Sequence, residues 1–151
     1  MLATLAEKEG DYERAEFWYT CILLAEPKYN NHMGVTVLYE RLAENASKRS
    51  DSAAQQHWLF RALELWENRG NIGQAAFRCL EIGRFFAEEG NCVKATEWMI
   101  RAVTKYREIQ YQKGIDFCNS FFDIVYAKAS PSDQRAMLER WAREPKQTGQ
   151  Q

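Results

Sequence analysis

The sequence predicts an all-α protein built from antiparallel helix pairs, with seven or eight helices in total. Three observations predict this class. Tryptophan recurs at a step of 40 residues, at Trp18, Trp58 and Trp98. Each 40-residue unit carries two apolar stripes at the helical spacing of three to four residues, and a turn separates the two stripes. No strand pattern competes with these stripes.

The 40-residue step also governs other positions. The tryptophan series continues to Leu138, which is again large and apolar. Three further series follow the same step, one large and apolar, one small or apolar and one turn-forming: Leu2, Leu42, Ile82 and Phe122; Ile22, Ala62, Ala102 and Ala142; Gly10, Ser50, Gly90 and Ser130. Repetition in several series indicates that residues 40 apart occupy equivalent places in stacked two-helix modules.

The stripes predict a helix order along the whole chain. We expect a partial helix at 1–9 and full helices at 11–26, 32–47, 52–68, 72–89, 91–109, 112–128 and 132–143. The segment 27–31 is expected to be a loop. At 151 residues the chain has the length of one domain, so we expect a single repeat domain over 1–143, followed by a polar tail over 144–151.

Turn and capping residues support these helix boundaries. Gly10, Gly70 and Gly90 follow helical stripes, where a left-handed backbone conformation ends a helix without a Cβ clash. An Asp or Asn follows each of these glycines and can cap the next helix. At the last turn Ser130 can cap a helix, and Pro131 suits its first position.

Composition and charge exclude several classes of partner. Hydrophobic residues make up 46% and charged residues 27% of the chain, which is typical of a folded domain. The net charge of -1 gives no general attraction to nucleic acid or to anionic membranes. No run approaches the roughly 18 apolar residues of a spanning helix, and the N-terminus does not resemble a signal peptide. We expect a cytoplasmic protein that binds neither nucleic acid nor membrane.

Residues that could perform chemistry are few. The two histidines, His32 and His57, lie on different predicted helices and outside any nucleophile or metal motif. The four cysteines are widely spaced without a C-x-x-C pair, which favours buried free thiols over disulfides or zinc ligands: Cys21, Cys79, Cys92 and Cys118. We therefore predict no enzyme activity, no cofactor, no metal site and no catalytic residue.

Two further patterns have alternative interpretations. The tryptophan series could stack against a ligand, but packing between repeats is the favoured interpretation. Basic residues gather on one predicted helix: Lys94, Arg101, Lys105 and Arg107. They could form a patch for an acidic partner, although a solvated helix face balanced by Glu97 and Glu108 is the favoured interpretation.

The third unit resembles the tetratricopeptide repeat. The residues that match the consensus span the turn of this unit: Ile82-Gly83, Phe86, Gly90-Asn91, Ala95, Met99 and Ala102. The segment from Gly10 to Pro27 looks like the second half of another such repeat, whereas the second and fourth units match less well. The 40-residue length is similar to the long-helix subclass found in kinesin light chains, G-protein-regulating scaffolds and bacterial Rap-type regulators.

This resemblance implies a right-handed α-solenoid whose first helices line a concave groove for a peptide. Transferred to this chain, the groove residues are one turn apart on each first helix: Val37, Glu40, Glu44, Phe77, Leu80, Arg84, Phe117, Ser120 and Ile124. The resemblance therefore implies a scaffold or adaptor that binds a protein or peptide partner. The open ends of such a solenoid would also permit self-association.

Other functions of this fold remain as alternatives. One is a regulatory domain, or a domain similar to a secretion chaperone, that changes its pitch when a peptide binds. Another is an accessory phosphatase action like that of Rap-type proteins, which would use an exposed amide: Gln55, Gln56 or Gln74. Nothing in the sequence distinguishes one of these glutamines from the others.

Overall fold

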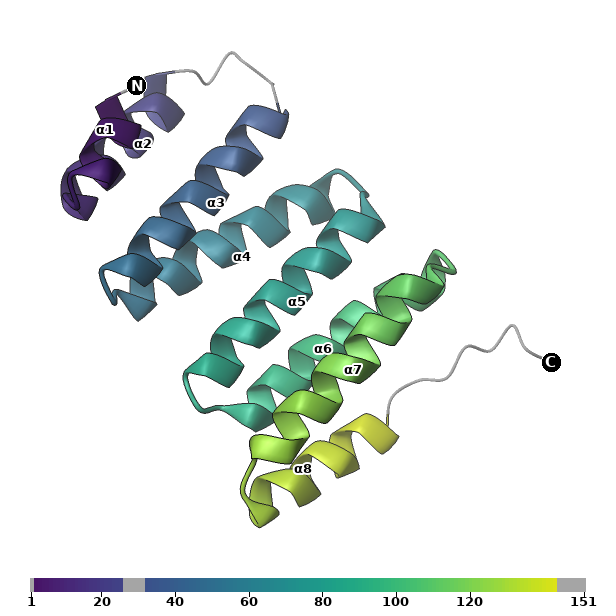
Figure 1. Cartoon of the computed structure of the whole chain (residues 1–151). Coiled ribbons are helices and arrows are strands. Elements are labelled where there is room, and N and C mark those ends of the chain that lie inside the picture. The colour runs from purple at the N-terminus through teal and green to yellow at the C-terminus, as the bar shows by residue number, and fades with distance from the viewer. Residues whose placement is uncertain (1, 26–31, 144–151) are drawn as a thin grey trace. The chain divides into compact units, whose positions relative to one another are not determined.

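The computed structural model describes residues 2–25 and 32–143, and every regular element in these ranges is an α-helix (Figure 1). The bounds of the eight helices are α1 Leu2–Lys8, α2 Tyr12–Ala25, α3 His32–Lys48, α4 Ser52–Asn68, α5 Ile72–Glu88, α6 Cys92–Glu108, α7 Gln112–Lys128 and α8 Pro131–Ala142. The all-α prediction is confirmed, and where both ends are described the helix ends lie within one residue of the predicted ones. The predicted loop at 27–31 and the tail at 144–151 lie outside the described residues.

Helix starts follow a step of 20 residues, half of the step seen in the sequence. The helices from α2 to α7 begin at residues 12, 32, 52, 72, 92 and 112. Each of α3, α4, α5, α6 and α7 is 17 residues long. A helix of 17 residues followed by a three-residue turn is therefore the local unit, and two such units make one 40-residue module.

The turns share one backbone geometry. Residues with positive φ lie at Gly10, Ser50, Gly70, Gly90 and Gln110. Around Gly90, its own N–H donates to the carbonyl of Ala87 at 3.1 Å, and the next N–H, that of Asn91, donates to the carbonyl of Phe86 at 2.8 Å. This pair of bonds is the Schellman motif, which satisfies the last carbonyls of a helix and reverses the chain.

The residue after each left-handed position begins the next helix as its N-cap. Four of these residues accept a hydrogen bond from the backbone N–H three residues further on, at 3.0–3.1 Å: Asp11, Asp51, Asn71 and Asn91. Tyr111 occupies the fifth such position and makes no side-chain cap. The prediction that Asp or Asn side chains cap these helices is confirmed, and a single residue thus links the end of one helix to the start of the next.

Residues 1–65 and 66–151 form two compact units, and the division falls within α4. In the N-terminal unit, the core joins α1, α2 and α3 through Ala3, Ala6, Ala15, Tyr19 and Leu42. Asn45 is fully buried and donates from Nδ2 to the carbonyl of Tyr12 at 2.7 Å, which fixes α3 against the start of α2. The single domain over 1–143 stays a prediction.

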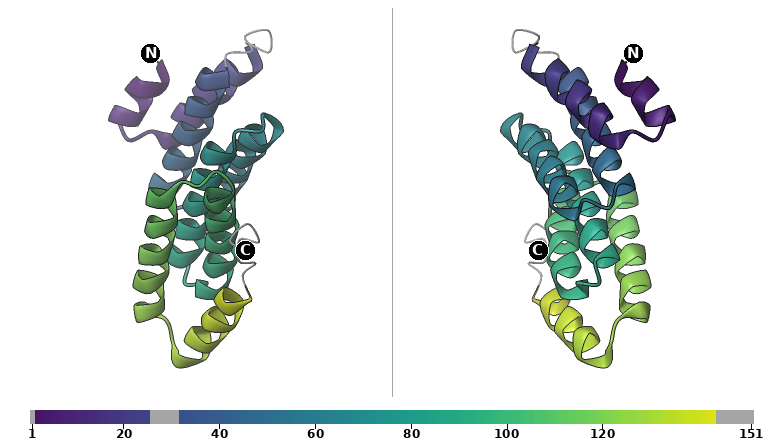
Figure 2. Two further views of the ribbon diagram at one scale, coloured as in Figure 1. Left: turned by 90° about the vertical axis from the view of Figure 1, so that its right-hand side faces the viewer. Right: turned by 90° about the vertical axis from the view of Figure 1, so that its left-hand side faces the viewer.

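In the C-terminal unit, α6 is the central helix and packs against α5, α7 and α8. Close approach of α5 and α6 depends on Gly83, where a Cβ atom would lie 3.3 Å from the carbonyl oxygen of Ala95. Figure 2 shows α7 and α8 diverging from the turn at residues 129–130. The ring of Trp141 on α8 nevertheless stacks on Phe122 of α7, with centroids 4.4 Å apart.

The helix α8 departs from the 40-residue step. Two residues separate α7 from α8, whereas three separate α5 from α6, so α8 begins one residue early. Ser130 has φ -65° and caps α8 by accepting from the N–H of Asp133. As a result Met137, and not Leu138, is the seventh residue of its helix, the place that Trp98 has in α6. Met137 is 0% exposed and Leu138 is 47% exposed, so the predicted continuation of the tryptophan series to Leu138 is wrong.

Candidate binding surface

The predicted groove residues of the C-terminal unit lie on α5 and α7, which both pack on α6. Phe77 and Phe117 are the sixth residues of these two helices, so their side chains leave equivalent positions. Phe77 is 45% exposed, Phe117 58% and Ile124 56%. Exposed aromatic and branched side chains of this size are typical of protein-interaction surfaces.

One predicted groove residue of this unit does not belong to that exposed set. Leu80 is 5% exposed and is part of the core. Ser120, its equivalent on α7, is exposed. We therefore use the name α5/α7 strip for the remaining residues of the C-terminal unit: Phe77, Arg84, Phe117, Ser120 and Ile124.

Arg84 supplies the charge of the α5/α7 strip. Its Nε atom donates to Oε1 of Glu88, four residues along the same helix, at 3.1 Å. The Arg84 side chain is 75% exposed and that of Glu88 56%. Exposed pairs of this kind contribute only about 0–1 kcal/mol, so a partner carboxylate could displace Glu88 at little cost.

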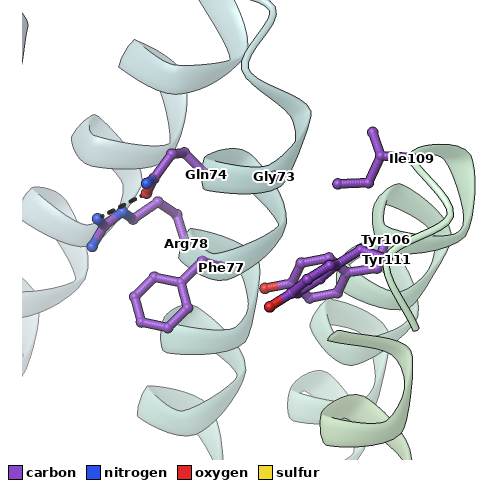
Figure 3. A pocket seen from close by; sticks show the side chains of 7 residues that line it. All are labelled: Gly73, Gln74, Phe77, Arg78, Tyr106, Ile109 and Tyr111. Carbon is purple, nitrogen blue, oxygen red and sulfur yellow. Dashed lines mark hydrogen bonds between the residues drawn. The ribbon is translucent and has the colours of Figure 1, made fainter. Parts of the chain in front are cut away.

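Phe77 also borders an open hollow of about 490 Å³ between α5 and the end of α6 (Figure 3). The hollow is lined by Gly73, Gln74, Phe77, Arg78, Tyr106, Ile109 and Tyr111. The rings of Tyr106 and Tyr111 have centroids 5.6 Å apart and planes at 47°. An apolar side chain of a partner would find aromatic surface on both sides of this hollow.

Sequence reasoning missed Ile109 and Tyr111, because it searched the first helix of each unit and these residues lie in the turn after α6. They are 42% and 48% exposed. A signal was present, since the equivalent turn positions before α6 hold Glu89 and Asn91, both polar. Ile109 stands in place of a polar turn residue, and Tyr111 stands in place of a capping Asn. Exposed apolar and aromatic side chains at these two positions indicate a role in binding rather than in helix capping.

Sequence reasoning also missed Arg78, the cation of the hollow. The residue is 6% exposed, and its Nη1 donates to Oε2 of Glu81 at 3.1 Å. Its Nη2 donates to Oε1 of Gln74 at 3.4 Å (Figure 3). Gln74, one of the glutamines considered for accessory chemistry, is thereby engaged with Arg78, while Gln55 and Gln56 are half-buried on α4.

Burial controls the ionisation of the groups near the hollow. It raises the pKa of the Tyr106 phenol to about 12, with smaller contributions from neighbouring Cys118 and Tyr111. Tyr106 therefore stays neutral at physiological pH and keeps its O–H as a hydrogen-bond donor. Burial likewise raises the pKa of the Cys79 thiol to about 12, so this thiol is a poor nucleophile.

The cysteines and metal-binding side chains of the described residues show no assembled site. Cys79 and Cys118 are buried, Cys21 and Cys92 are half-buried, and all four are free thiols. Within residues 2–25 and 32–143, no three His, Cys, Asp or Glu side chains gather in a way that could hold a metal ion.

In the N-terminal unit, α3 carries the other predicted groove residues. Val37 is 47% exposed, Glu40 is half-buried, and Glu44 is exposed. Lys48 lies 3.5 Å from the carboxylate of Glu44 on the same helix. This part of α3 thus carries one exposed apolar side chain, Val37, and two carboxylates one helical turn apart, Glu40 and Glu44.

The three repeated tryptophans serve mainly in packing. Each is the seventh residue of its helix. Trp18 packs on the N-terminal core, Trp58 stacks on Tyr39 with centroids 5.7 Å apart, and Trp98 is 7% exposed. The guanidinium of Arg101 lies 4.3 Å from the Trp98 ring centroid, a cation–π contact that covers the outer side of the ring.

The basic residues of α6 mostly have partners within the chain. Lys94 lies 4.7 Å from the Phe86 ring centroid, and Lys105 lies 3.7 Å from the carboxylate of Glu67. Together with the Arg101–Trp98 contact, these interactions favour the interpretation of this side as a solvated and internally compensated helix face.

No family model, curated protein or solved structure matches the chain significantly. Among the described helices, none combines the length and the apolar character needed to cross a membrane.

Proposed function

We propose that the chain is a protein-interaction module of the tetratricopeptide-like class, a scaffold or adaptor that binds a peptide or protein segment. The observation that carries the proposal is the α5/α7 strip, where Phe77, Phe117 and Ile124 are each 45% exposed or more. Full burial of an exposed side chain of this size contributes roughly 1.5–3 kcal/mol, and these three side chains, which are about half exposed, forgo about half of that amount each. A partner that covers them recovers part of this free energy.

The hollow beside Phe77 supports the same function. Its aromatic walls can receive one apolar side chain. Arg84 on the strip can donate hydrogen bonds to a carboxylate of the same partner. A partner segment with apolar side chains and a nearby acidic group therefore has complementary chemistry. The N-cap Asn71 at the start of α5 and the Schellman turn around Gly90 at its end hold this surface on a regular helix.

Co-purification with matched variants tests the proposal. A tagged chain with Phe77, Phe117 and Ile124 all replaced by Ala should lose partners that the native chain captures, as measured by quantitative mass spectrometry. Phe17→Ala is the control, because Phe17 is 59% exposed on α2 and lies outside the strip, whereas Phe117 is 58% exposed. Circular dichroism establishes that both variants are folded. Equal capture by native and triple-variant chains would remove the α5/α7 strip as the binding surface.

A further inference from the structure

Tyr106 brings a polar group to the hollow that the packing of α6 does not require. The residue is 6% exposed and lines the hollow. Phe86 is the fifteenth residue of α5, as Tyr106 is of α6, and it is also 6% exposed. A phenylalanine therefore fills the equivalent place, and the hydroxyl of Tyr106 is an addition to this packing.

The Tyr106 hydroxyl is directed into the hollow without a partner in the described chain. Figure 3 shows its oxygen pointing towards α5 and Phe77. Within residues 2–25 and 32–143 this hydroxyl forms no hydrogen bond, although the phenol groups of buried tyrosines usually find one. Gly114 of α7 lies against the Tyr106 ring and holds it in place. A fixed and unpartnered donor at a residue so deeply buried indicates that a bound group completes its hydrogen bond.

A second hydroxyl points in the same direction. Tyr111 occupies an N-cap position but makes no side-chain cap, whereas Asn91 at the equivalent position accepts from the N–H of Lys94 at 3.1 Å. The two tyrosine rings have centroids 5.6 Å apart, and both phenol oxygens are directed towards α5 (Figure 3). The start of α7 thus forgoes a capping side chain, and the hollow gains a second donor.

The other polar groups of the hollow also favour an acceptor as the bound group. Oε1 of Gln74 accepts from Nη2 of Arg78 at 3.4 Å, which leaves the amide N–H groups of Gln74 as its donors. The Arg78 side chain is 7% exposed, whereas that of its partner Glu81 is 32% exposed, so water screens the carboxylate more than the guanidinium. Donors beside a poorly screened cation bind a carboxylate more strongly than a neutral acceptor.

We propose that the hollow binds the carboxylate of a glutamate side chain in the partner segment, with the hydroxyls of Tyr106 and Tyr111 as its donors. The methylene groups of the glutamate lie against the aromatic walls, and an apolar neighbour in the segment covers Phe77. This inference rests on the proposed function, because the segment must first lie along the α5/α7 strip. It adds a chemical selection at the hollow, for glutamate over glutamine.

Peptide selection followed by a double-mutant cycle tests this assignment. A phage-displayed library of random peptides is selected on the native chain, and the most enriched sequence should contain a glutamate next to an apolar residue. Replacing this glutamate by glutamine in the synthetic peptide should weaken binding about tenfold or more in fluorescence polarisation. Tyr106→Phe/Tyr111→Phe should weaken binding of the original peptide to a similar extent. The two changes together should weaken binding no more than either alone, because they remove the same interaction.

Tyr126→Phe is the matched control. Tyr126 is the fifteenth residue of α7 and lies outside the lining of the hollow, so loss of its hydroxyl should leave the affinity unchanged. The double Tyr→Phe variant should fold as the native chain does, since Phe86 fills the place equivalent to Tyr106 and Tyr111 makes no cap. Circular dichroism and thermal unfolding check the fold of all variants.

The outcomes separate this inference from the proposed function. Selected peptides that require Phe77, Phe117 and Ile124 but lack a glutamate overturn the carboxylate site and leave the α5/α7 strip intact. Peptides that bind the double Tyr→Phe variant as tightly as the native chain have the same consequence. Selection of no peptide, or of peptides that the strip triple variant binds equally well, contradicts the proposed function and this inference with it.

Discussion

Gly114 on α7 lies directly against the ring of Tyr106 on α6. A Cβ atom at Gly114 would approach three atoms of this ring to 2.6–2.7 Å. Tyr106 is 6% exposed, so its ring has little room to move away. The absence of a side chain at Gly114 is therefore what permits α7 to pack against the end of α6.

Gly114→Ala should lower the free energy of unfolding by up to about 2 kcal/mol, because the overpacking cost of about 1–3 kcal/mol exceeds the roughly 1 kcal/mol that alanine contributes to a helix. Gly73→Ala is the matched control, since its Cβ would make an ordinary contact of 3.5 Å with Cδ1 of Ile109. This control should be neutral or stabilising. Urea unfolding measures both values, and an equally small effect at the two sites would contradict the close packing of α6 and α7.

The left-handed turn residues predict a pair of opposite effects. Gln110 has φ 55° and Gly90 has φ 83°. Gln110→Gly should stabilise the chain by about 0.5–1 kcal/mol, since glycine adopts this conformation without strain. Gly90→Ala should cost about 1 kcal/mol, although a Cβ there meets no atom within 4 Å. The midpoint of thermal unfolding, Tm, should rise for Gln110→Gly and fall for Gly90→Ala. A shift of Tm in the same direction for both variants would contradict the equivalence of the turns at residues 90 and 110.

The sequence allowed the helix order and most helix ends to be predicted, because glycines and Asp or Asn caps mark the turns. The 20-residue step was not recognised, since the two helices of a module bury different faces and the tryptophan, apolar, small-residue and turn series were followed in steps of 40. Ser50 and Gln110 also take left-handed conformations without being glycine.

The start of α8 was only partly predictable. Ser130 and Pro131 indicate a helix start. The loss of one turn residue shifts every later residue of α8, and counting in steps of 40 cannot detect this shift. For the candidate site, counting along α5 and α7 located Phe77, Phe117 and Ile124, but it could not separate buried Leu80 from exposed Ser120.

The shifted register of α8 predicts very different costs at two adjacent residues. Met137→Ala should destabilise the chain by about 2–5 kcal/mol, because it removes a fully buried side chain. Leu138→Ala should change stability by less than about 0.5 kcal/mol in dilute protein. Chemical denaturation of both variants provides the comparison. A larger loss of unfolding free energy for Leu138→Ala than for Met137→Ala would contradict the shifted register and support an unbroken 40-residue step.

Burial of Cys79 predicts a loss of stability in alkaline solution. The folded state raises the thiol pKa from 9.0 to about 12, so between these values the folded chain holds a proton that the unfolded chain releases. Stability is therefore fully present below pH 9 and falls as pH rises towards 12, by at most about 1.4 kcal/mol per pH unit for one group. Cys79→Ala should show a shallower decline in unfolding free energy over this interval. Identical slopes for the two proteins would contradict a protonated, buried thiol.

Photo-crosslinking in cells tests the proposed function most directly. A photoreactive phenylalanine analogue at position 117, on the α5/α7 strip, should give specific covalent adducts with a protein partner. The same analogue at position 17, where the native Phe is equally exposed at 59%, should give few or none. Adducts at position 17 alone, or equal yields at both positions, would contradict the claim that the α5/α7 strip is the working surface of this protein.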